Sequence, residues 1–521
     1  MSIVETVRLG KGTSAETGSG SADSRGMSSL IVLVEQVEKL VQDSASGGRS
    51  FHDFELDLHE MVQRIGNMAT RQFIALQGDG DLGESVTTDE GVVLHRSVEP
   101  VVRPFQTVFG QFDIRAFVYS RGEKRRIELR PVDARMQLPG GHASFLFEEF
   151  AQYFCVEQAF DRSAEAIQRI LRQTISKETL ERMNQRVGLQ AEEYLDSLVA
   201  PPAADEGDLL IVTGDGKGVP LVKADLALVP IFDPDERRGN RRMATLGCVY
   251  SVDRFVRTSD EILAGLFREK NERVDERSRP KPIAKQLVAR FSRERDLGDG
   301  VESISGQVEA FVWTSERVRD RLKPGQPLIV LLDGAPSQWD TIHDCLDSEV
   351  SERAVEILDL IHVSQYIWRA AKVFHPHREH QEAFARERLD RILHGDAASV
   401  ITGIRSMATR RRLKGLSLTE ITKVCGYLEN NKHRMKYNEY LAAGYPIATG
   451  VIEGACRHLV KDRMERSGMR WTIKGAQPML NIRAIHQSQD RSNFYQTRIQ
   501  KELDALYPHK SLILNYQPCQ A

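Results

Sequence analysis

The chain has 521 residues, 41% of them hydrophobic and 28% charged, which is typical of a soluble globular protein with several domains. It contains no run of about 20 apolar residues, the length that a membrane-spanning helix needs. Its N-terminus has no basic segment followed by an apolar run, so we expect no secretory signal and no membrane partner. Six scattered cysteines without a CxxC pair argue against a disulfide framework or a zinc ribbon. We therefore expect a cytoplasmic protein with reduced thiols.

The net charge of −3 conceals an uneven distribution. Residues 1–100 contain 8 Lys and Arg against 16 Asp and Glu, a balance of −8. Residues 401–474 contain 15 against 6, a balance of +9. A local basic surface attracts a polyanion whatever the charge of the whole chain. The basic stretch is therefore either a nucleic-acid interface or an ordinary solvated helical face, and composition leaves both interpretations open.

The first hundred residues are expected to be helical where they are ordered. Residues 1–28 are rich in Gly and Ser, which predicts a disordered tail. Apolar residues at helical spacing predict two helices between Ser29 and Gln77. An acidic, polar stretch over 78–105 predicts a loop that completes an N-terminal helical region, 29–105.

The next region, 106–200, combines a hairpin with helices. Alternation along Gln111–Ser120 and Arg126–Arg135 predicts a β-hairpin. Ser163–Arg172 and Ser176–Val187 have the proportions of a helix-turn-helix, with Ser176 as the N-cap of its second helix. This pair is either a DNA-binding unit or plain scaffolding, and in the first case it would present Lys177, Arg182 and Arg186 to DNA.

From residue 207 onward, short apolar strands alternate with helices, which predicts an α/β core over 207–363. The strands are expected at 208–213, 243–253, 308–314, 328–332 and 355–360. Residues 364–443 are charged and helical, and we expect an all-α insertion there. Residues 444–490 would complete the core with a helix that carries Glu453, and 491–521 would form a C-terminal tail.

Two of the predicted strands end in Asp-Gly, at Asp215 and Asp333. Ligands bind at strand ends in α/β sheets, and a pair of carboxylates is unfavourable there unless a cation lies between them. Mg²⁺ takes carboxylates, waters and phosphate oxygens as ligands. Glu453, at the start of a basic helix, is the candidate third carboxylate. Taken singly, each Asp-Gly is an ordinary strand-to-turn signal; the three together favour a metal-dependent nuclease or phosphotransferase.

Four segments resemble, in matching order, motifs of the Kra-type family of insertion-sequence transposases. The long C-terminal segment is highly specific, whereas the first two would not be diagnostic alone. The resemblance extends from about residue 105 to residue 487. The segments are Asp215–Pro220 (DGKGVP), Leu332–Ala335 (LDGA), Asp359–Val363 (DLIHV) and Gly444–Trp471, which includes GYPIATGVIEGACRHLVKDRM and SGMRW.

This resemblance implies a bacterial, nucleoid-associated DDE transposase with a ribonuclease-H-like α/β core. Its metal-binding and catalytic triad would be Asp215, Asp333 and Glu453, separated by 118 and 120 residues. Two Mg²⁺ or Mn²⁺ ions are implied. No zinc is expected, because the predicted hairpin lacks the CxxC pair that related sequences carry. Asp359 and His362 match an Asp-x-x-His element that would contact the transposon end or flank the metal site, while a structural role for His362 stays open.

Candidate DNA-binding residues follow from charge and from the resemblance. Basic side chains against phosphate give affinity without sequence information. Trp471 would either stack on a distorted base or pack in the core. The histidines of the insertion, His375, His377 and His380, are expected to be exposed rather than metal-bound. The candidates are Arg410, Arg411, Arg412, Lys414, Arg457, Lys461, Arg463, Arg466 and Trp471.

The function expected from the resemblance is cleavage at terminal inverted repeats followed by strand transfer into target DNA. Residues before about 205 would recognise the repeats, and a homodimer or higher oligomer would hold two ends together. Two alternatives stay open: a domesticated DNA-binding protein without activity, and a ribonuclease-H-like nuclease without strand transfer.

Overall fold

The computed structural model describes residues 22–232, 239–268, 279–296, 298, 300–466 and 468–518, with side chains from Leu30 onward. Residues 1–21 of the predicted tail lie outside these ranges, whereas residues 22–28 belong to the first helix, so that part of the tail prediction is wrong. Within the described ranges, no helix combines the length and apolar character that crossing a membrane requires.

The chain forms two compact units. Unit 1 comprises residues 1–150, 165–174 and 499–521, and unit 2 comprises 151–164 and 175–498. Three helices contribute residues to both units, and they are α4 (Phe145–Glu157), α5 (Phe160–Leu171) and α19 (Arg491–Leu506).

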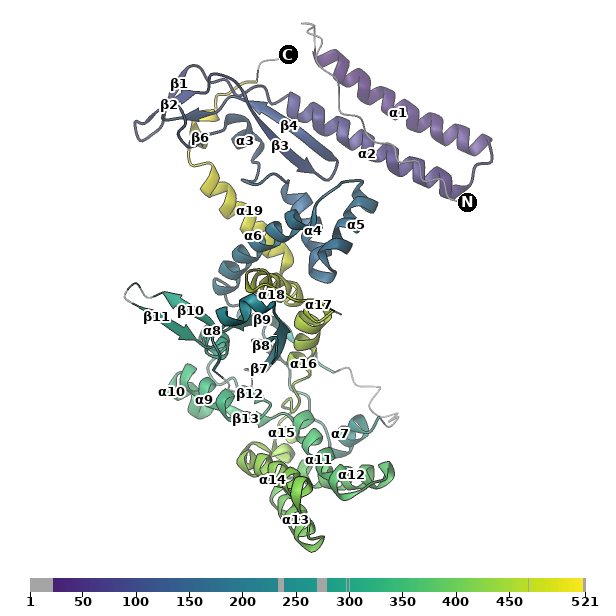
Figure 1. The fold of residues 1–521 in the computed structure, drawn as a ribbon, viewed down its shortest axis with the longest axis vertical. Helices are drawn as coiled ribbons and strands as arrows, with labels where there is room; N and C mark the ends of the chain where they lie inside the picture. The colour runs from purple at the N-terminus through teal and green to yellow at the C-terminus, as the bar shows by residue number, and fades with distance from the viewer. Residues whose placement is uncertain are drawn as a thin grey trace. The chain divides into compact units, whose positions relative to one another are not determined.

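Unit 1 contains a pair of long helices and two small antiparallel sheets (Figure 1). Ser50 caps the second helix by accepting a hydrogen bond from the backbone N–H of Asp53. One sheet has the order β1-β2-β5-β6, and the other pairs β3 with β4. The elements are α1 (Ala22–Ser46), α2 (Phe51–Ala75), β1 (Ser85–Thr87), β2 (Val93–Arg96), β3 (Val101–Thr107), β4 (Gly110–Ala116), β5 (Tyr119–Ser120), β6 (Ile127–Leu129), α3 (Pro131–Met136) and η6 (Lys510–Ile513).

The hairpin predictions for unit 1 need correction. The long hairpin is β3–β4, in register from Val101↔Ala116 to Thr107↔Gly110, so the predicted loop over 78–105 is wrong. The side chains of its two strands point alternately toward the core and toward solvent. The loop was predicted from the acidic composition of 78–105, which does not show this alternation. Only the short β5–β6 pair lies at the predicted position. The second predicted strand ends early because Pro131 begins α3, where its missing N–H costs nothing.

Unit 2 is built on a five-stranded mixed sheet with the order β13-β12-β7-β8-β9. The hairpin β7–β8 and the pair β8–β9 are antiparallel, whereas β12 is parallel to both β7 and β13. A two-stranded ribbon, β10–β11, follows β9. The strands are β7 (Leu209–Pro220), β8 (Arg241–Val252), β9 (Ile283–Phe291), β10 (Arg293–Asp296), β11 (Val301–Ile304), β12 (Leu328–Leu332) and β13 (Val355–Leu358).

One predicted strand of the core is a helix. Residues 308–314 lie in α8 (Gly306–Arg321), which Ser305 caps and which buries Ala310, Phe311 and Val318 at helical spacing. The short apolar run there fits a strand and a buried helix equally well by periodicity. The missing third strand is β9, which the prediction omitted. Other short helices of the core are η1 (Ala203–Asp205), η2 (Lys223–Leu228), α7 (Ser259–Leu266), α9 (Pro336–Cys345) and α10 (Ser348–Arg353).

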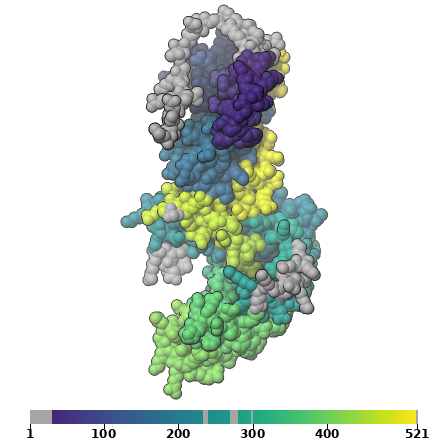
Figure 2. Space-filling view, turned by 90° about the vertical axis from the view of Figure 1, so that its right-hand side faces the viewer, coloured from purple at the N-terminus to yellow at the C-terminus, as the bar shows by residue number. Residues whose placement is uncertain are grey.

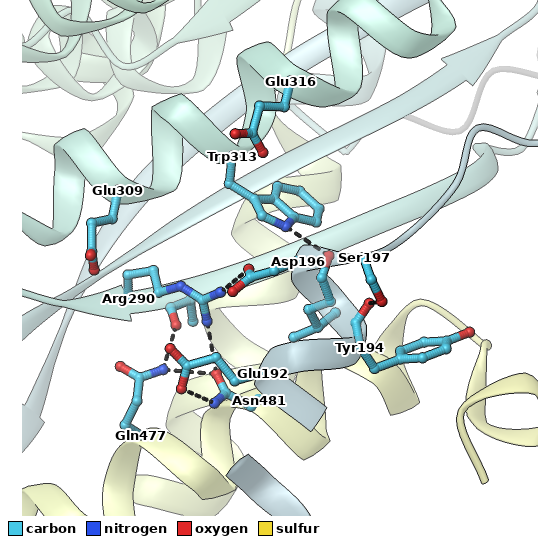
Figure 3. Close-up of polar contacts among 12 residues, drawn as sticks. Glu192, Tyr194, Asp196, Ser197, Arg290, Glu309, Trp313, Glu316, Gln477 and Asn481 are labelled. Carbon is cyan, nitrogen blue, oxygen red and sulfur yellow. Dashed lines mark hydrogen bonds and ion pairs between the residues drawn. The ribbon is translucent and has the colours of Figure 1, made fainter. Parts of the chain in front are cut away.

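Helices α6 (Lys177–Asp196) and α18 (Ile473–Gln487) pack together beside β9. Ser176 caps α6 by accepting a hydrogen bond from the backbone N–H of Thr179, as predicted. Figure 3 shows how polar side chains join these elements: Arg290 of β9 donates to Asp196 at 2.6 Å and to Asn481 at 3.0 Å. The indole of Trp313 donates to the carbonyl oxygen of Leu195 at 3.0 Å. The second helix of the predicted helix-turn-helix therefore scaffolds unit 2.

The span predicted as an all-α insertion consists of helices. Figure 2 shows most of this span, in green, as a lobe that stands out from the residues of the sheet. The chain then returns to the core through a short helix that continues as a π-helix, η5. The elements are α11 (Leu360–Phe374), α12 (Arg378–Leu393), α13 (Ala397–Arg410), α14 (Gly415–Asn430), η4 (Lys432–Arg434), α15 (Tyr437–Ala442), α16 (Gly450–Ala455), η5 (Cys456–Lys461) and α17 (Asp462–Met464).

Candidate active site

Three neighbouring strands bring aspartates to the same level of the sheet. Leu331 of β12 is in register with Thr213 of β7 and with Ile357 of β13. In each of the three strands, an aspartate follows two residues after this registered position. Because side chains alternate along a strand, an equal offset directs the three carboxyl groups to the same face. These residues are Asp215, Asp333 and Asp359.

Asp215 lies within β7 and not after its end, which corrects the predicted strand 208–213. The glycines around it look like a turn in the sequence. However, β8 pairs with every residue from Leu209 to Pro220, so the backbone stays extended. Gly214 is required for packing, because a Cβ atom there would lie 2.6 Å from the ring of Phe311.

The carboxyl group of Asp215 is half-buried and accepts two hydrogen bonds. The backbone N–H of Gly216 donates to Oδ1 at 2.7 Å, and the thiol of Cys456 donates to Oδ2 at 3.2 Å. Burial raises the pKa of Asp215, and the charge of Asp333 raises it further, while the two hydrogen bonds act in the opposite direction. Cys456 was not among the predicted site residues; its position one helical turn after Glu453 was the available signal.

Asp333 follows β12 in a turn that the insertion holds. Its Oδ1 accepts a hydrogen bond from the N–H of Ala335 at 2.9 Å. Its main-chain carbonyl accepts one from the phenol of Tyr427 on α14 at 2.7 Å. Gly334 has a φ of +93°, in the region that favours glycine, and Asn431 donates to its carbonyl at 3.3 Å.

Asp359 is fully buried and organises two helices. Its carboxylate caps α11, accepting from the N–H groups of Ile361 at 3.1 Å and His362 at 3.3 Å. The same carboxylate accepts from the N–H of Thr449 at 3.0 Å, just before α16. Because α16 carries Glu453, Asp359 fixes the position of that helix relative to the strand ends.

His362 is oriented by Asp359. Its Nδ1 lies 2.6 Å from Oδ2 of Asp359, which leaves Nε2 as the ring nitrogen available to a ligand. The hydrogen bond with Asp359 raises the pKa of His362, and the charges of Asp333 and Asp215 raise it further against the effect of burial. The element predicted from the resemblance thus lies at the site, with Asp359 in a structural role and His362 facing the other carboxylates.

Glu453 completes the cluster from α16. It is half-buried, and the pKa of its carboxyl group is raised first by burial and then by the charge of Asp359. In the described part of the chain, one group of possible metal ligands brings its atoms within 4.8 Å of one another, and it consists of Asp359, His362 and Glu453. The predicted set of Asp215, Asp333 and Glu453 shares only Glu453 with that group.

The donor set suits a hard divalent cation. Carboxylate oxygens and one imidazole nitrogen converge, and the carboxyl groups of Asp215 and Glu453 both have a raised pKa. Like charges placed together in a half-buried site are costly unless a cation neutralises them. Oxygen ligands of this kind are the ones that Mg²⁺ and Mn²⁺ take.

Two predicted DNA-binding residues are core residues instead. The side chain of Arg463 is completely buried, and its Nε donates to the carbonyl of Cys155 at 2.8 Å. Burial lowers the pKa of Arg463 to about 9. Trp471 is 6% exposed, and its indole donates to the carbonyl of Met464 at 3.2 Å. The DNA-binding prediction is therefore wrong for Arg463, whereas for Trp471 the core-packing alternative is confirmed. Charge and aromaticity in a sequence do not say which side of a helix or loop faces the core.

The remaining predicted DNA-binding residues are exposed. Arg457, whose side chain is 72% exposed, lies 3.9 Å from Asp462. Arg411 is tied to the end of α11, since its guanidinium contacts the ring and the carbonyl of Phe374. Those exposed to solvent are Arg410, Arg411, Arg412, Lys414, Arg457, Lys461 and Arg466.

No family model and no curated protein matches the chain. Three chains among solved structures match, and one of them is described as "Drosophila P element transposase strand transfer complex". It aligns with a TM-score of 0.23 and 10% sequence identity over 72% of this chain and 85% of that chain. A TM-score of 0.23 does not define a shared fold.

Proposed function

We propose that the chain is a DDE transposase of the Kra-type insertion-sequence family, with a ribonuclease-H-like core. The observation that carries this proposal is that Asp215, Asp333 and Asp359 lie at the same level of adjacent strands. Asp359 also accepts a hydrogen bond from the N–H of Thr449, just before the helix that carries Glu453. The sheet supports it, because three antiparallel strands followed by two parallel ones are what such a core requires. The long helical span between β13 and α16 supports it as the insertion that precedes the final glutamate.

Asp215, Asp333 and Glu453 would hold two divalent cations, with Asp359 and His362 beside them. When bound, such ions activate an attacking oxygen and stabilise the leaving oxygen of a phosphodiester. Asp359 keeps α11 and α16 together, so that the carboxyl groups do not depend on a ligand for their placement. His362, oriented by Asp359, would offer Nε2 to the cations as a neutral imidazole.

The substrate would be DNA, first the terminal inverted repeats of the element and then the target. Exposed basic residues at the end of α13 and just after it, on η5 and just after α17 would contact phosphates, which gives affinity but no sequence selection. Two transposon ends must be held together during strand transfer, so we propose a dimer or higher oligomer on DNA.

Cleavage of a labelled duplex that carries the element's terminal repeat tests the reaction. Wild type should cut at the repeat with Mg²⁺ or Mn²⁺, and Glu453→Gln should lower the rate by about 10³-fold, as expected when a metal ligand is lost. Glu439→Gln, at an exposed glutamate of α15, is the matched control and should keep full activity. Cutting without joining of the 3′ end would favour the nuclease alternative, and binding without cutting would favour the domesticated one.

A second measurement does not need activity. Mg²⁺ that binds the folded state alone should raise Tm as its concentration rises. Asp215→Asn should abolish that rise without lowering Tm in the metal-free protein, because it removes a carboxylate whose charged form is disfavoured by burial and by the charge of Asp333. A metal-free Asp215→Asn protein that fails to fold would show instead that this carboxylate is structural.

A further inference from the structure

A pocket of about 750 Å³ lies within unit 1, and all of its lining residues belong to that unit. We call it the unit 1 pocket. Its walls come from β3, from β6 and its flanking residues, from α3 and the segment after it, and from the end of α19 with the residues that follow. The volume lies within the roughly 300–1,000 Å³ typical of small-ligand sites. The carboxylate cluster belongs to unit 2, so this pocket is a separate site.

A buried ion pair forms one wall of the unit 1 pocket. The side chain of Arg103 is 10% exposed, and it is paired with Asp133, whose side chain is 4% exposed. The guanidinium of Arg103 also donates to the carbonyl oxygens of Pro139 and Gly141. These contacts hold β3, α3 and the segment after α3 together, so this wall is formed before any ligand binds.

The other arginines of the wall carry charge that is not fully neutralised. Nε of Arg121 donates to Glu128 at 2.8 Å, so this pair has no net charge. Arg130 lies 4.0 Å from Asp133, a carboxylate that the buried guanidinium already holds. Arg126 is exposed, and in the described part of the chain its guanidinium has no hydrogen bond or ion pair. With four arginines against one glutamate and one aspartate, the lining has an excess of two positive charges.

This positive charge contrasts with the composition of its surroundings. Residues 1–100, which make up more than half of unit 1, have a balance of −8. Like charges gathered in one pocket repel each other, and a bound anion removes that cost. The planar guanidinium fork matches phosphate oxygens in pairs. A phosphate monoester carries roughly two negative charges near neutral pH, which equals the excess in the lining.

The rest of the lining suits an organic body attached to that phosphate. A phosphate group alone fills only a small part of about 750 Å³. Val102 is 47% exposed and Leu506 is 37% exposed, so two large apolar side chains of the lining are open to solvent. His142, Tyr507 and His509 add rings to the same lining. A ligand with a ring would cover these side chains and gain the free energy of burying apolar surface.

We propose that the unit 1 pocket binds a small organic phosphate monoester of about mononucleotide size. Its phosphate would contact Arg126 and Arg130, and its organic body would cover Val102 and Leu506. The site goes beyond the proposed function, because it uses none of the carboxylates and needs no DNA. The ligand would join β6 to the segment after α19, which lie far apart in the sequence, so binding should stabilise the folded chain.

Isothermal titration of the full chain with single compounds tests this site. The buffer contains EDTA, so that no divalent cation occupies the carboxylate cluster. AMP and glucose 6-phosphate are the probes, and adenosine and inorganic phosphate are controls that each lack one half of AMP. At least one probe should bind at least ten-fold more tightly than either control, because it uses both the arginines and the apolar wall. If neither probe does so, the proposal is wrong.

Variants connect binding to the arginines. Arg126→Ala should raise the Kd of the probe at least ten-fold, as expected for the loss of a charge-assisted pair of hydrogen bonds. Arg126→Lys keeps the charge without the planar fork and should raise Kd by about three-fold. Arg125→Ala, at an exposed arginine outside the lining, is the matched control and should leave Kd unchanged.

Two further results would overturn the proposal. Equal losses in Arg126→Ala and Arg125→Ala would show only a general attraction of anions to this surface. A duplex with 5′-phosphates that binds through Arg126, while neither AMP nor glucose 6-phosphate binds, would make the pocket part of a DNA interface. Neither result bears on cleavage at the terminal repeat, so the failure of this proposal is distinguishable from that of the proposed function.

Discussion

The phenol of Tyr427 donates a hydrogen bond of 2.7 Å to the main-chain carbonyl of Asp333, and this contact joins the helical insertion to the candidate active site. The ring of Tyr427 also stacks on Tyr366 of α11, with centroids 3.7 Å apart and planes within 3°. The guanidinium of Arg369 lies 4.5 Å from the centre of the Tyr366 ring. The insertion therefore does more than lengthen the chain before Glu453, because it holds the turn that follows β12.

Tyr427→Phe should lower the rate of strand cleavage by about ten-fold while leaving DNA affinity unchanged. The substitution keeps the stacked ring and removes one hydrogen bond, which is worth about 1 kcal/mol to stability. Tyr440→Phe is the matched control, since its phenol donates to the carbonyl of Glu356 at 3.0 Å, on β13. Equal rate losses in the two variants would show that Tyr427 acts only on general stability.

Arg463 and Lys461 are basic neighbours in sequence with opposite expected behaviour. Arg463→Ala should destabilise unit 2 by several kcal/mol, since it removes a buried group that fills space between two rings and donates to Cys155. Lys461→Ala should leave Tm unchanged and lower the slope of log Kd against log salt concentration by about one, as for one lost phosphate contact. Thermal melts and binding titrations at several salt concentrations separate the two, and the reverse pattern would restore Arg463 as a DNA contact.

Gly188 of α6 lies against Pro478 of α18. A Cβ atom at Gly188 would lie 2.3 Å from Cβ of Pro478, so Gly188→Ala should destabilise unit 2 by about 1–3 kcal/mol through overpacking. Gly403→Ala, on α13 with nothing within 4 Å, should instead stabilise by up to about 1 kcal/mol through helix propensity. Denaturant unfolding of both variants measures the contrast, and a neutral Gly188→Ala would mean that the two helices separate easily.

His486 of α18 should make stability depend on pH. Burial lowers the pKa of His486 to about 4, so between about pH 4 and 6.5 the unfolded state binds more protons than the folded state. The contribution of neutral His486 to the free energy of unfolding is therefore fully present above pH 6.5. It is lost as pH falls toward 4, and the free energy of unfolding is lower by about 1–2 kcal/mol at pH 5. His486→Leu should flatten the difference in unfolding free energy between pH 7.5 and pH 5, whereas His52→Leu, at an exposed histidine, should not.

Local sequence signals predicted several elements well. The strand 328–332 and the cap at Ser176 are where the sequence places them, because an apolar run and a serine before a helix act through their immediate neighbours. The insertion helices followed from long charged stretches with helical spacing. By contrast, β9 and α8 were missed or misassigned, since a short apolar run has no period that separates a strand from a buried helix.

The sequence by itself determined which residue types the site has to work with: acidic residues beside apolar runs and at the start of a basic helix. Only the tertiary structure decided which of them meet. The register of β7, β12 and β13 aligns Asp215 and Asp333 with Asp359, whose carboxylate holds α16 in place. Burial decided that Arg463 and Trp471 belong to the core. Register and burial depend on contacts between residues far apart in the chain, and such contacts leave no mark on local spacing or composition.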